Sequence, residues 1–385
     1  MTGPGSPVPA GPSVVQLLAR AYLSRVAEAP APALSRLVGE LGPVESARRV
    51  RVGRVPDAVA AETATRRMID RAEADLAALD AVCGRLLTPE HPDWPSWPFA
   101  AYGLADEREL TPPLALWVRG PGRLAQLCER SVAVVGARAA TGYGLHMAAE
   151  LAAGLADRAV TVISGAAIGV DGAAHRGALS VDGATVAVLA CGVDRVYPLA
   201  HERLIARIAE TGLLVSEYPP DAVPARHRFL VRNRLIAGLA AGTLVVEAGL
   251  RSGAQRTAAD AQAMGRVLMA LPGPVTSGMS AGCHRLIRDG AVLVTRVEEV
   301  LECVGRIGED LAPELVSGDE RLTDRLDPVA ARVHDALPSR AARTTQWLSM
   351  EAGLSIDAVR VALVDLERRR LVQHHAGRWQ RPTGV

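Results

Sequence analysis

The feature that most constrains the fold of this chain is an alternation of short apolar segments with segments rich in small residues, which runs from residue 131 to residue 304. Near-continuous apolar runs are typical of buried parallel strands. Strands that alternate with helices over short loops predict a doubly wound parallel α/β sheet with right-handed crossovers, whose ligands bind beyond the carboxyl ends of the strands. The predicted strands are residues 131–136, 160–165, 184–190, 213–217, 242–248 and 266–271, with a short last strand at 291–294.

Two segments precede this sheet region. Residues 1–13 are rich in proline and glycine and are predicted to be a disordered tail. Residues 14–87 show helical patterns and predict an N-terminal helical domain, in which the Gly-Pro turn at 37–43 fits a helix-hairpin-helix. Such turns also join helices that do not contact DNA. The sheet domain is expected to span residues 88–304 and to include a strand in residues 114–120.

A separate small domain follows the sheet. Residues 305–326 are polar and acidic and predict a linker. Residues 327–385 contain one helical pattern, two more helices around a Gly-Leu turn, and a hairpin with Ala376 and Gly377 at its tip. A helix, a helix-turn-helix and a hairpin in this order predict a winged helix.

Any binding of anions must be local, because the formal net charge is only 43 − 42 = +1. The sequence contains no lysine, so the basic side chains available to bind phosphate are arginines. A guanidinium group stays charged and can bind two phosphate oxygens at once.

Composition also limits the compartment and the kind of site. The five cysteines are odd in number and are not spaced as metal ligands, which argues against a disulfide framework and structural zinc. The first residues lack the features of an export signal, and no apolar run is long enough to cross a bilayer. We therefore expect a cytoplasmic chain that does not enter a membrane.

The stretch from Arg226 to Arg234 is the strongest local indication of function. It holds four arginines, one aromatic residue and no acidic residue in nine positions, inside an otherwise apolar region. Cations grip phosphates while an aromatic ring receives a base, which is how single-stranded nucleic acid is usually held. The alternative is a solvated helix face or a set of ion pairs, and the stretch alone does not decide between them.

The loop after the first strand of the sheet, residues 136–144, carries groups that suit an anion. It offers Gly136, Arg138 and Thr141 before a helix, whose N-terminus favours negative charge. It lacks the lysine of a Walker loop, and it has Arg138 where a dinucleotide loop needs glycine. We therefore expect it to hold an external phosphate.

Two further loops carry small residues or hydroxyl groups next to a helix. Ser164 and Gly165 follow the second strand, with Asp171 at the next helix start, and Ser252 and Gly253 precede a later helix. Backbone and hydroxyl groups at such places can donate to phosphate. Asp171 and Ser252 are equally well explained as plain helix N-caps.

No loop combines a nucleophile with a base or gathers metal ligands, so the sequence predicts a binding surface without catalytic residues, metal or cofactor. Cys191 has no basic partner set near it by the sequence and is interpreted as an inert thiol. His175 is interpreted as a structural hydrogen-bonding residue.

Eight motifs, in a fixed order over residues 90–304, resemble a known family, the DNA-processing protein A (DprA/Smf) family. The motifs are Val135-Gly136-Ala137-Arg138, Ser164-Gly165-Ala166 with Gly169, Asp171 and His175, Tyr197-Pro198, Ser216-Glu217, Phe229 with Arg232-Asn233-Arg234, Glu247 with Ser252-Gly253, Pro272-Gly273, and Gly282-Cys283. The helical region and the winged helix fit the three-part layout of that family.

The resemblance implies an extended Rossmann-like fold and a homodimer that binds single-stranded DNA. It also implies that the protein protects incoming or exposed single strands and helps to load the RecA recombinase during transformation and recombination. Carried over to this sequence, Arg138 is the phosphate-binding arginine and Phe229 is the base-contacting aromatic, with Arg226 three residues before it. The complete predicted interface is Gly136, Arg138, Thr141, Ser164, Gly165, Arg226, Phe229, Arg232, Asn233, Arg234, Ser252 and Gly253.

Two residues depart from the family pattern. His284 and Arg256 differ from it and are expected to affect the rim of the binding site.

Two alternative functions remain open. Lysine-decarboxylase-like phosphoribohydrolases have a similar fold, but their Pro-Gly-Gly-x-Gly-Thr loop is absent from residues 247–257. A winged-helix regulator of duplex DNA is the other alternative, although the presumed recognition helix, residues 355–370, has little polar face.

Overall fold

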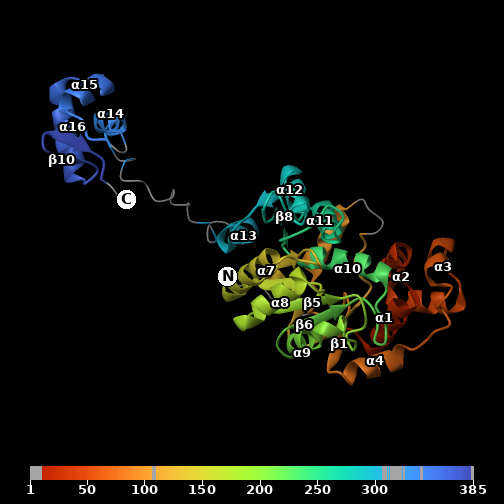
Figure 1. Ribbon diagram of the computed structural model, residues 1–385. Helices are drawn as coiled ribbons and strands as arrows, with labels where there is room; N and C mark the ends of the chain where they lie inside the picture. Colours follow the sequence, from red (N-terminus) through yellow and green to blue (C-terminus); the bar gives the residue numbers. More distant parts are fainter. Residues whose placement is uncertain are drawn as a thin grey trace, which may run out of the picture. The chain divides into compact units, whose positions relative to one another are not determined.

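The computed structural model describes residues 11–105, 110–305, 310, 312, 323, 326–338 and 341–382. The chain forms two compact units, Met1–Ala312 and Pro313–Val385, and Figure 1 shows the helices and strands of each. Most of the predicted tail (1–13) and linker (305–326) lies outside the described residues. Ser13, which the sequence analysis places in the tail, is instead the N-cap of the first helix and accepts a hydrogen bond from the Gln16 amide.

A nine-stranded sheet forms the centre of the first unit, in the order β1-β2-β6-β5-β4-β3-β7-β8-β9. From β6 to β9 in this order all neighbours are parallel, whereas β2 pairs antiparallel with both β6 and β1. The predicted α/β class is therefore confirmed. The strands are β1 Gly84–Leu87, β2 Leu116–Arg119, β3 Ser131–Val135, β4 Thr161–Ser164, β5 Thr185–Leu189, β6 Leu213–Ser216, β7 Gly242–Val245, β8 Val267–Ala270 and β9 Val292–Leu293.

Strand β1 corrects the sequence analysis, which includes residues 84–87 in the N-terminal helical region. These residues pair with β2, with Leu86 opposite Trp117. A short apolar run fits the spacing of a helix as well as that of a strand, so periodicity alone does not distinguish them.

Helices cover both faces of the sheet, because successive residues of a buried strand point to opposite sides. Ala133 and Val135 of β3 share one core with α10, α11 and α12, whereas Val132 and Val134 share another with α7, α8 and α13. The helices of the sheet region are α5 Ser96–Ala100, α6 Leu124–Glu129, α7 Gly142–Asp157, α8 Val170–Ser180, α9 Glu202–Thr211, α10 Arg226–Leu239, α11 Ala254–Ala263, α12 Ala281–Arg288 and α13 Val297–Val304, with 3-10 turns Ala101–Leu104 and Leu199–His201.

The N-terminal helices complete the cover of the second face. Buried side chains of α1, α2 and α4 share a core with Trp117 of β2 and Leu214 of β6. α2 is interrupted at Gly42, whose φ of 76° lies in the left-handed region, so the predicted Gly-Pro turn forms a kink between two helical segments. These helices are α1 Val14–Val26, α2 Pro32–Val52, α3 Asp57–Thr63 and α4 Ala72–Asp80.

The sheet changes direction of winding between β3 and β7. From β3 the chain passes through α7 to β4 on one side, and from β7 it passes through α11 to β8 on the other side. The loops after β3 and β7 therefore diverge and leave a crevice at the carboxyl ends of these strands, where ligands of such sheets bind.

The second unit is a winged helix, with α14 (Pro328–Ala336), α15 (Thr345–Ala352), α16 (Ile356–Arg368), β10 (Gln373–His375) and β11 (Arg378–Gln380). It has its own hydrophobic core. The hairpin tip has positive φ at two consecutive positions, 50° at Ala376 and 74° at Gly377, as a two-residue type I′ turn requires.

Helix α10 is anchored to the sheet by a buried ion pair. Arg234 Nη2 donates to both carboxylate oxygens of Glu217 at 2.7 Å, and both side chains are at most 9% exposed. The Tyr102 hydroxyl donates to the Arg234 carbonyl at 2.8 Å. These contacts fix the second half of α10 against the end of β6.

We expect Arg234→Met to destabilise the first unit, because Glu217 would keep a buried charge without its cation. Loss of one partner of such a pair costs about 3–5 kcal/mol, which urea unfolding followed by circular dichroism would measure. Arg207→Met is the matched control, because Arg207 forms an exposed and longer ion pair, at 3.5 Å, with the exposed Asp182. A loss in Arg234→Met no larger than in the control would contradict the anchoring role.

Candidate nucleic-acid interface

A cavity of about 560 Å³ lies in the crevice between β3 and β7. Three segments form its walls: residues 136–139 after β3, residues 249–254 at the start of α11, and one face of α10. The cavity is therefore at the carboxyl edge of the sheet, where the fold predicts a ligand.

Three arginines from different segments line this cavity with their charges available. Arg138 follows β3, Arg226 begins α10, and Arg251 follows β7, and all three are exposed. Within the part of the chain that the structure describes, none of them forms an ion pair or hydrogen bond with a carboxylate. Arg251 is not among the predicted site residues, although its position directly before Ser252 and Gly253 could have indicated it.

An aromatic ring lies against one of these cations and also lines the cavity. Phe229 lies beneath Arg138, whose Cζ is 5.0 Å from the ring centroid, and the Tyr197 ring is 5.3 Å from Phe229. Arg138 and Phe229 also line a second cavity of about 270 Å³, together with Tyr197 and Ile168. The two side chains thus form a shared wall between a cationic cavity and a more apolar one.

Arg232 and Asn233 lie deeper than the three exposed arginines. The helix begins at Arg226, so these residues occupy its second turn. Arg232 is 3% exposed and donates to the Val188 carbonyl at 2.5 Å, while its Nε has no partner among the described atoms. Asn233 donates to the Gly253 carbonyl at 3.4 Å. Both line the cavity floor.

The buried Asp171 also lines the cavity, close to Arg232. Burial raises the pKa of the Asp171 carboxyl, and the nearby Arg232 guanidinium opposes this shift. Asp171 accepts hydrogen bonds from the amides of Gly165 at 3.2 Å and Ala167 at 3.4 Å, whereas Gly169 is the N-cap of α8. The N-cap interpretation of Asp171 is therefore wrong, because its carboxylate organises the preceding loop.

The structure places three predicted interface residues outside the lining of both cavities, and it places Gly165 in the lining of the second cavity alone. Ser164 is fully buried and donates to the Val134 carbonyl at 2.6 Å. The backbone amide and the hydroxyl of Thr141 each donate a hydrogen bond of 2.8 Å to the Glu247 carboxylate. Arg234 is occupied by its buried ion pair.

The Glu247 carboxylate corrects the expectation of a phosphate at the start of α7. It accepts hydrogen bonds from Thr141, the N-cap of that helix, and a Cβ atom at Gly144 would overlap it. An internal anion thus already occupies the site that the sequence assigns to an external one. Arg138, in the same loop, remains directed to the cavity.

The predicted glycines and Ser252 have packing roles beside the cavity. A Cβ atom at Gly136 would lie 2.6 Å from Val170 Cγ2, and one at Gly165 would overlap the Arg232 guanidinium. Gly165 therefore leaves the room that Arg232 needs. Ser252 accepts a hydrogen bond from the Ala254 amide at 3.2 Å, and Gly253 is the N-cap of α11. Ser252 and Gly253 both line the cavity.

The structure gives no support for a nucleophile or metal site at this edge. Burial raises the pKa of the Cys191 thiol to about 11, so it is protonated at neutral pH. His175 is buried, with Nδ1 2.7 Å from the Thr185 hydroxyl. Among the described residues, no group of histidine, cysteine or acidic side chains is arranged to hold a metal ion. In the same residues, no helix is both long and apolar enough to span a bilayer.

The two departures from the family pattern lie beside the cavity and not in its lining. His284 Nε2 is 3.0 Å from the Gly273 carbonyl, and Arg256 pairs with Asp260 at 2.8 Å. Both side chains therefore have local partners.

The winged helix of the second unit presents a mixed surface on α16. Val361 is 73% exposed and Val364 62% exposed, and Arg360 lies 3.5 Å from Asp357. Groove reading needs polar groups that face the base edges. The exposed Val361 and Val364 offer no polar groups, so this face of α16 does not favour the reading of base edges in a DNA groove.

Comparison with known proteins finds relatives of the sheet region and of most of the chain. Residues 85–305 match the model of the family described as DNA recombination-mediator protein A. The chain is 52% identical to the putative DNA processing protein DprA of Mycobacterium tuberculosis H37Rv, over 94% of this chain and 93% of that protein. It is 41% identical to protein Smf of Escherichia coli K12, over 66% of this chain and 72% of that protein.

A solved structure has the same fold. The X-ray structure of DNA processing protein A from Streptococcus pneumoniae superimposes with a TM-score of 0.60 at 29% identity, over 76% of this chain and 98% of that one. The residues matched by the family model include every residue that lines the two cavities. The chain belongs to the DNA recombination-mediator protein A (DprA/Smf) family, as the order of its motifs indicates.

Proposed function

We propose that this chain binds single-stranded DNA, without turning it over, in the cavity between β3, β7 and α10. The observation that carries the proposal is the convergence of Arg138, Arg226 and Arg251, from three separate crossovers, on one cavity that Phe229 also lines. Cations for the backbone next to a ring for a base are the groups that a single strand needs. The names of the relatives, which are DNA processing proteins, agree with a role in handling DNA.

Each group in the cavity has a distinct role in the proposal. Arg138, Arg226 and Arg251 contact phosphates, while Phe229 receives a base. Arg232 and Asn233 form the polar floor, and Gly136, Gly165, Ser252 and Gly253 shape the walls. Thr141, Ser164 and Arg234 hold the surrounding structure.

We expect the cavity to bind single strands in preference to duplexes because of the position of the Phe229 ring. Phe229 is only partly exposed and is flanked by Arg138 and Tyr197. A base inside a duplex is stacked on both sides and cannot present its face to such a ring, whereas an unpaired base can. Phosphate contacts by arginine carry no sequence information, so we expect little sequence preference.

The assembly implied by the family is part of the same proposal. We propose a homodimer that protects single-stranded DNA and helps to load the RecA recombinase on it. Strand β9 ends the sheet at one edge, and its Val292 and Leu293 are 44% and 49% exposed. An apolar edge strand of this kind is a suitable surface for a second copy. Sedimentation of the purified chain at several concentrations would test the dimer.

A nucleotide-hydrolysing activity is the competing function. Cys191 lines neither cavity and burial keeps its thiol protonated at neutral pH, while Glu247 accepts hydrogen bonds from Thr141. We expect no release of free base when a nucleoside 5′-monophosphate is incubated with the protein. Release of base above the rate without protein, measured by chromatography, would favour the hydrolase function.

We expect Arg138→Ala and Arg226→Ala each to weaken binding of a fluorescent oligothymidine. Each lost phosphate contact should also reduce the slope of log affinity against log salt by about 0.7. Fluorescence anisotropy at several salt concentrations measures both quantities. Arg207→Ala is the control, because Arg207 lies outside the cavity lining. Unchanged affinity and slope in both cavity variants would refute the assignment.

We expect Phe229→Leu to weaken binding for a different reason. Loss of a stacked base costs about 1–3 kcal/mol, but no charge is removed, so the salt slope should stay that of the parent. The same anisotropy titrations distinguish the two effects. A changed slope with little change in affinity at low salt would show that Phe229 acts on the arginines and not on a base.

A further inference from the structure

The first turn of α10 lacks the groups that normally stabilise the start of a helix. Its N-cap, Ala225, makes no side-chain hydrogen bond, and its first turn has no acidic residue. Instead, Arg226, His227 and Arg228 place basic groups at the positive end of the helix dipole. Uncapped amides and cations at this end both disfavour the helical turn.

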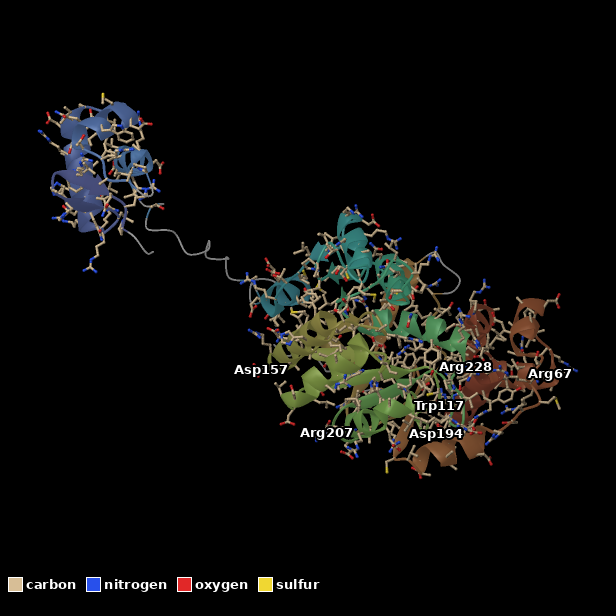
Figure 2. All side chains as sticks on the ribbon, viewed as in Figure 1. Arg67, Trp117, Asp157, Asp194, Arg207 and Arg228 are labelled. Carbon is tan, nitrogen blue, oxygen red and sulfur yellow. The ribbon has the colours of Figure 1, made fainter. Side chains whose placement is uncertain are left out.

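A carboxylate from the N-terminal region supplies the missing negative charge. Glu28, in the connection between α1 and α2, accepts hydrogen bonds from Arg228 Nε at 2.7 Å and Arg228 Nη2 at 3.0 Å. Its Oε1 is 3.1 Å from His227 Nε2, and its Oε2 is 2.7 Å from Arg66 Nη1. One acid therefore joins the start of α10 to the N-terminal helices, and Figure 2 shows Arg228 where these segments meet.

Glu28 is charged at neutral pH in this setting. Partial burial raises the pKa of its carboxyl, but hydrogen bonds from Arg228, Arg66 and His227 outweigh burial and lower the pKa to about 2.

Glu28 contacts residues of α10 that do not line the cavity. Residues of a helix are rotated by about 100° from one to the next. Arg226, Phe229 and Leu230 therefore lie within about 100° of one another, and they line the cavity. His227 and Arg228, which pair with Glu28, are absent from the cavity lining. Glu28 therefore supports the turn without occupying the cavity.

The segment before α10 is held by neighbouring contacts. Arg25 donates to the Pro220 carbonyl at 2.8 Å, and the Asp221 amide donates to Asp194 at 3.0 Å. Arg195 also pairs with Asp221. The approach to the helix is thus fixed by other groups, and Glu28 acts on the first turn itself.

We propose that Glu28 is a positioning residue for single-stranded DNA, which keeps the first turn of α10 helical so that Arg226 and Phe229 stay at the cavity. The inference rests on the proposed function for its effect on DNA, although its effect on the helix does not need DNA. It gives the N-terminal helical region a part in binding without placing that region in contact with the strand.

The test compares Glu28→Gln with Glu45→Gln. Glu45 is a matched control because it also pairs with two arginines of the N-terminal region, Arg48 and Arg49, at 2.7 Å. We expect Glu28→Gln to weaken oligothymidine binding about two- to fivefold, the range of a lost charge at a helix end. Amide hydrogen exchange in residues 225–235 should become faster, while the control changes neither quantity. The melting temperature should move no more in Glu28→Gln than in the control.

A double variant tests whether Glu28 acts through its helix partner. In an Arg228→Gln background, Glu28→Gln should cause at most a small further loss of affinity, because the main contact is already gone. A full additional loss would show that Glu28 does not act through Arg228 and would overturn the proposal. Tighter binding in Glu28→Gln would also overturn it, because the carboxylate would then act mainly by repelling the strand.

The two proposals fail in different ways. If the cavity does not bind DNA, Arg138→Ala leaves affinity unchanged, yet faster exchange in Glu28→Gln still shows that Glu28 supports the turn. If exchange in residues 225–235 is the same in Glu28→Gln and in the parent, the positioning role is wrong even when Arg138→Ala weakens binding.

Discussion

The cationic character of the cavity depends on which nearby arginines are left without a carboxylate. Arg234 and Arg228 also belong to the basic stretch of α10, but each forms an ion pair. Glu217 pairs with Arg234, and Glu28 pairs with Arg228. Arg138, Arg226 and Arg251 line the cavity and have no such partner in the described part of the chain. With a formal net charge of only +1, the chain obtains a cationic site by this partition and not by excess charge.

The sequence indicates much of this arrangement, because the positions of strands and loops along the chain follow from periodicity. The strands from β3 to β9, the loop containing Arg138 and the basic stretch of α10 are all at the places predicted. A near-continuous apolar strand does not tell which way its last residue points, so the sequence does not show that Ser164 donates to the Val134 carbonyl. Contacts between distant segments are also not visible in one sequence, which explains why the sequence does not indicate Glu28 or the role of Glu247.

The ion-pair interpretation of the arginine stretch is confirmed for Arg228 and Arg234. Arg226 and Phe229 line the cavity instead, and they share a side of α10 because they are separated by about one turn. The same nine residues therefore supply cavity-lining groups and structural anchors. That the cavity-lining groups bind nucleic acid stays a prediction.

The most direct measurement is a crystal structure of the chain with a short oligothymidine. The account predicts phosphate oxygens within hydrogen-bonding distance of Arg138, Arg226 and Arg251, and a thymine ring against Phe229, with Glu217 still paired to Arg234. A strand bound away from this cavity, or bound there with these three guanidinium groups turned to solvent, would contradict the central claim.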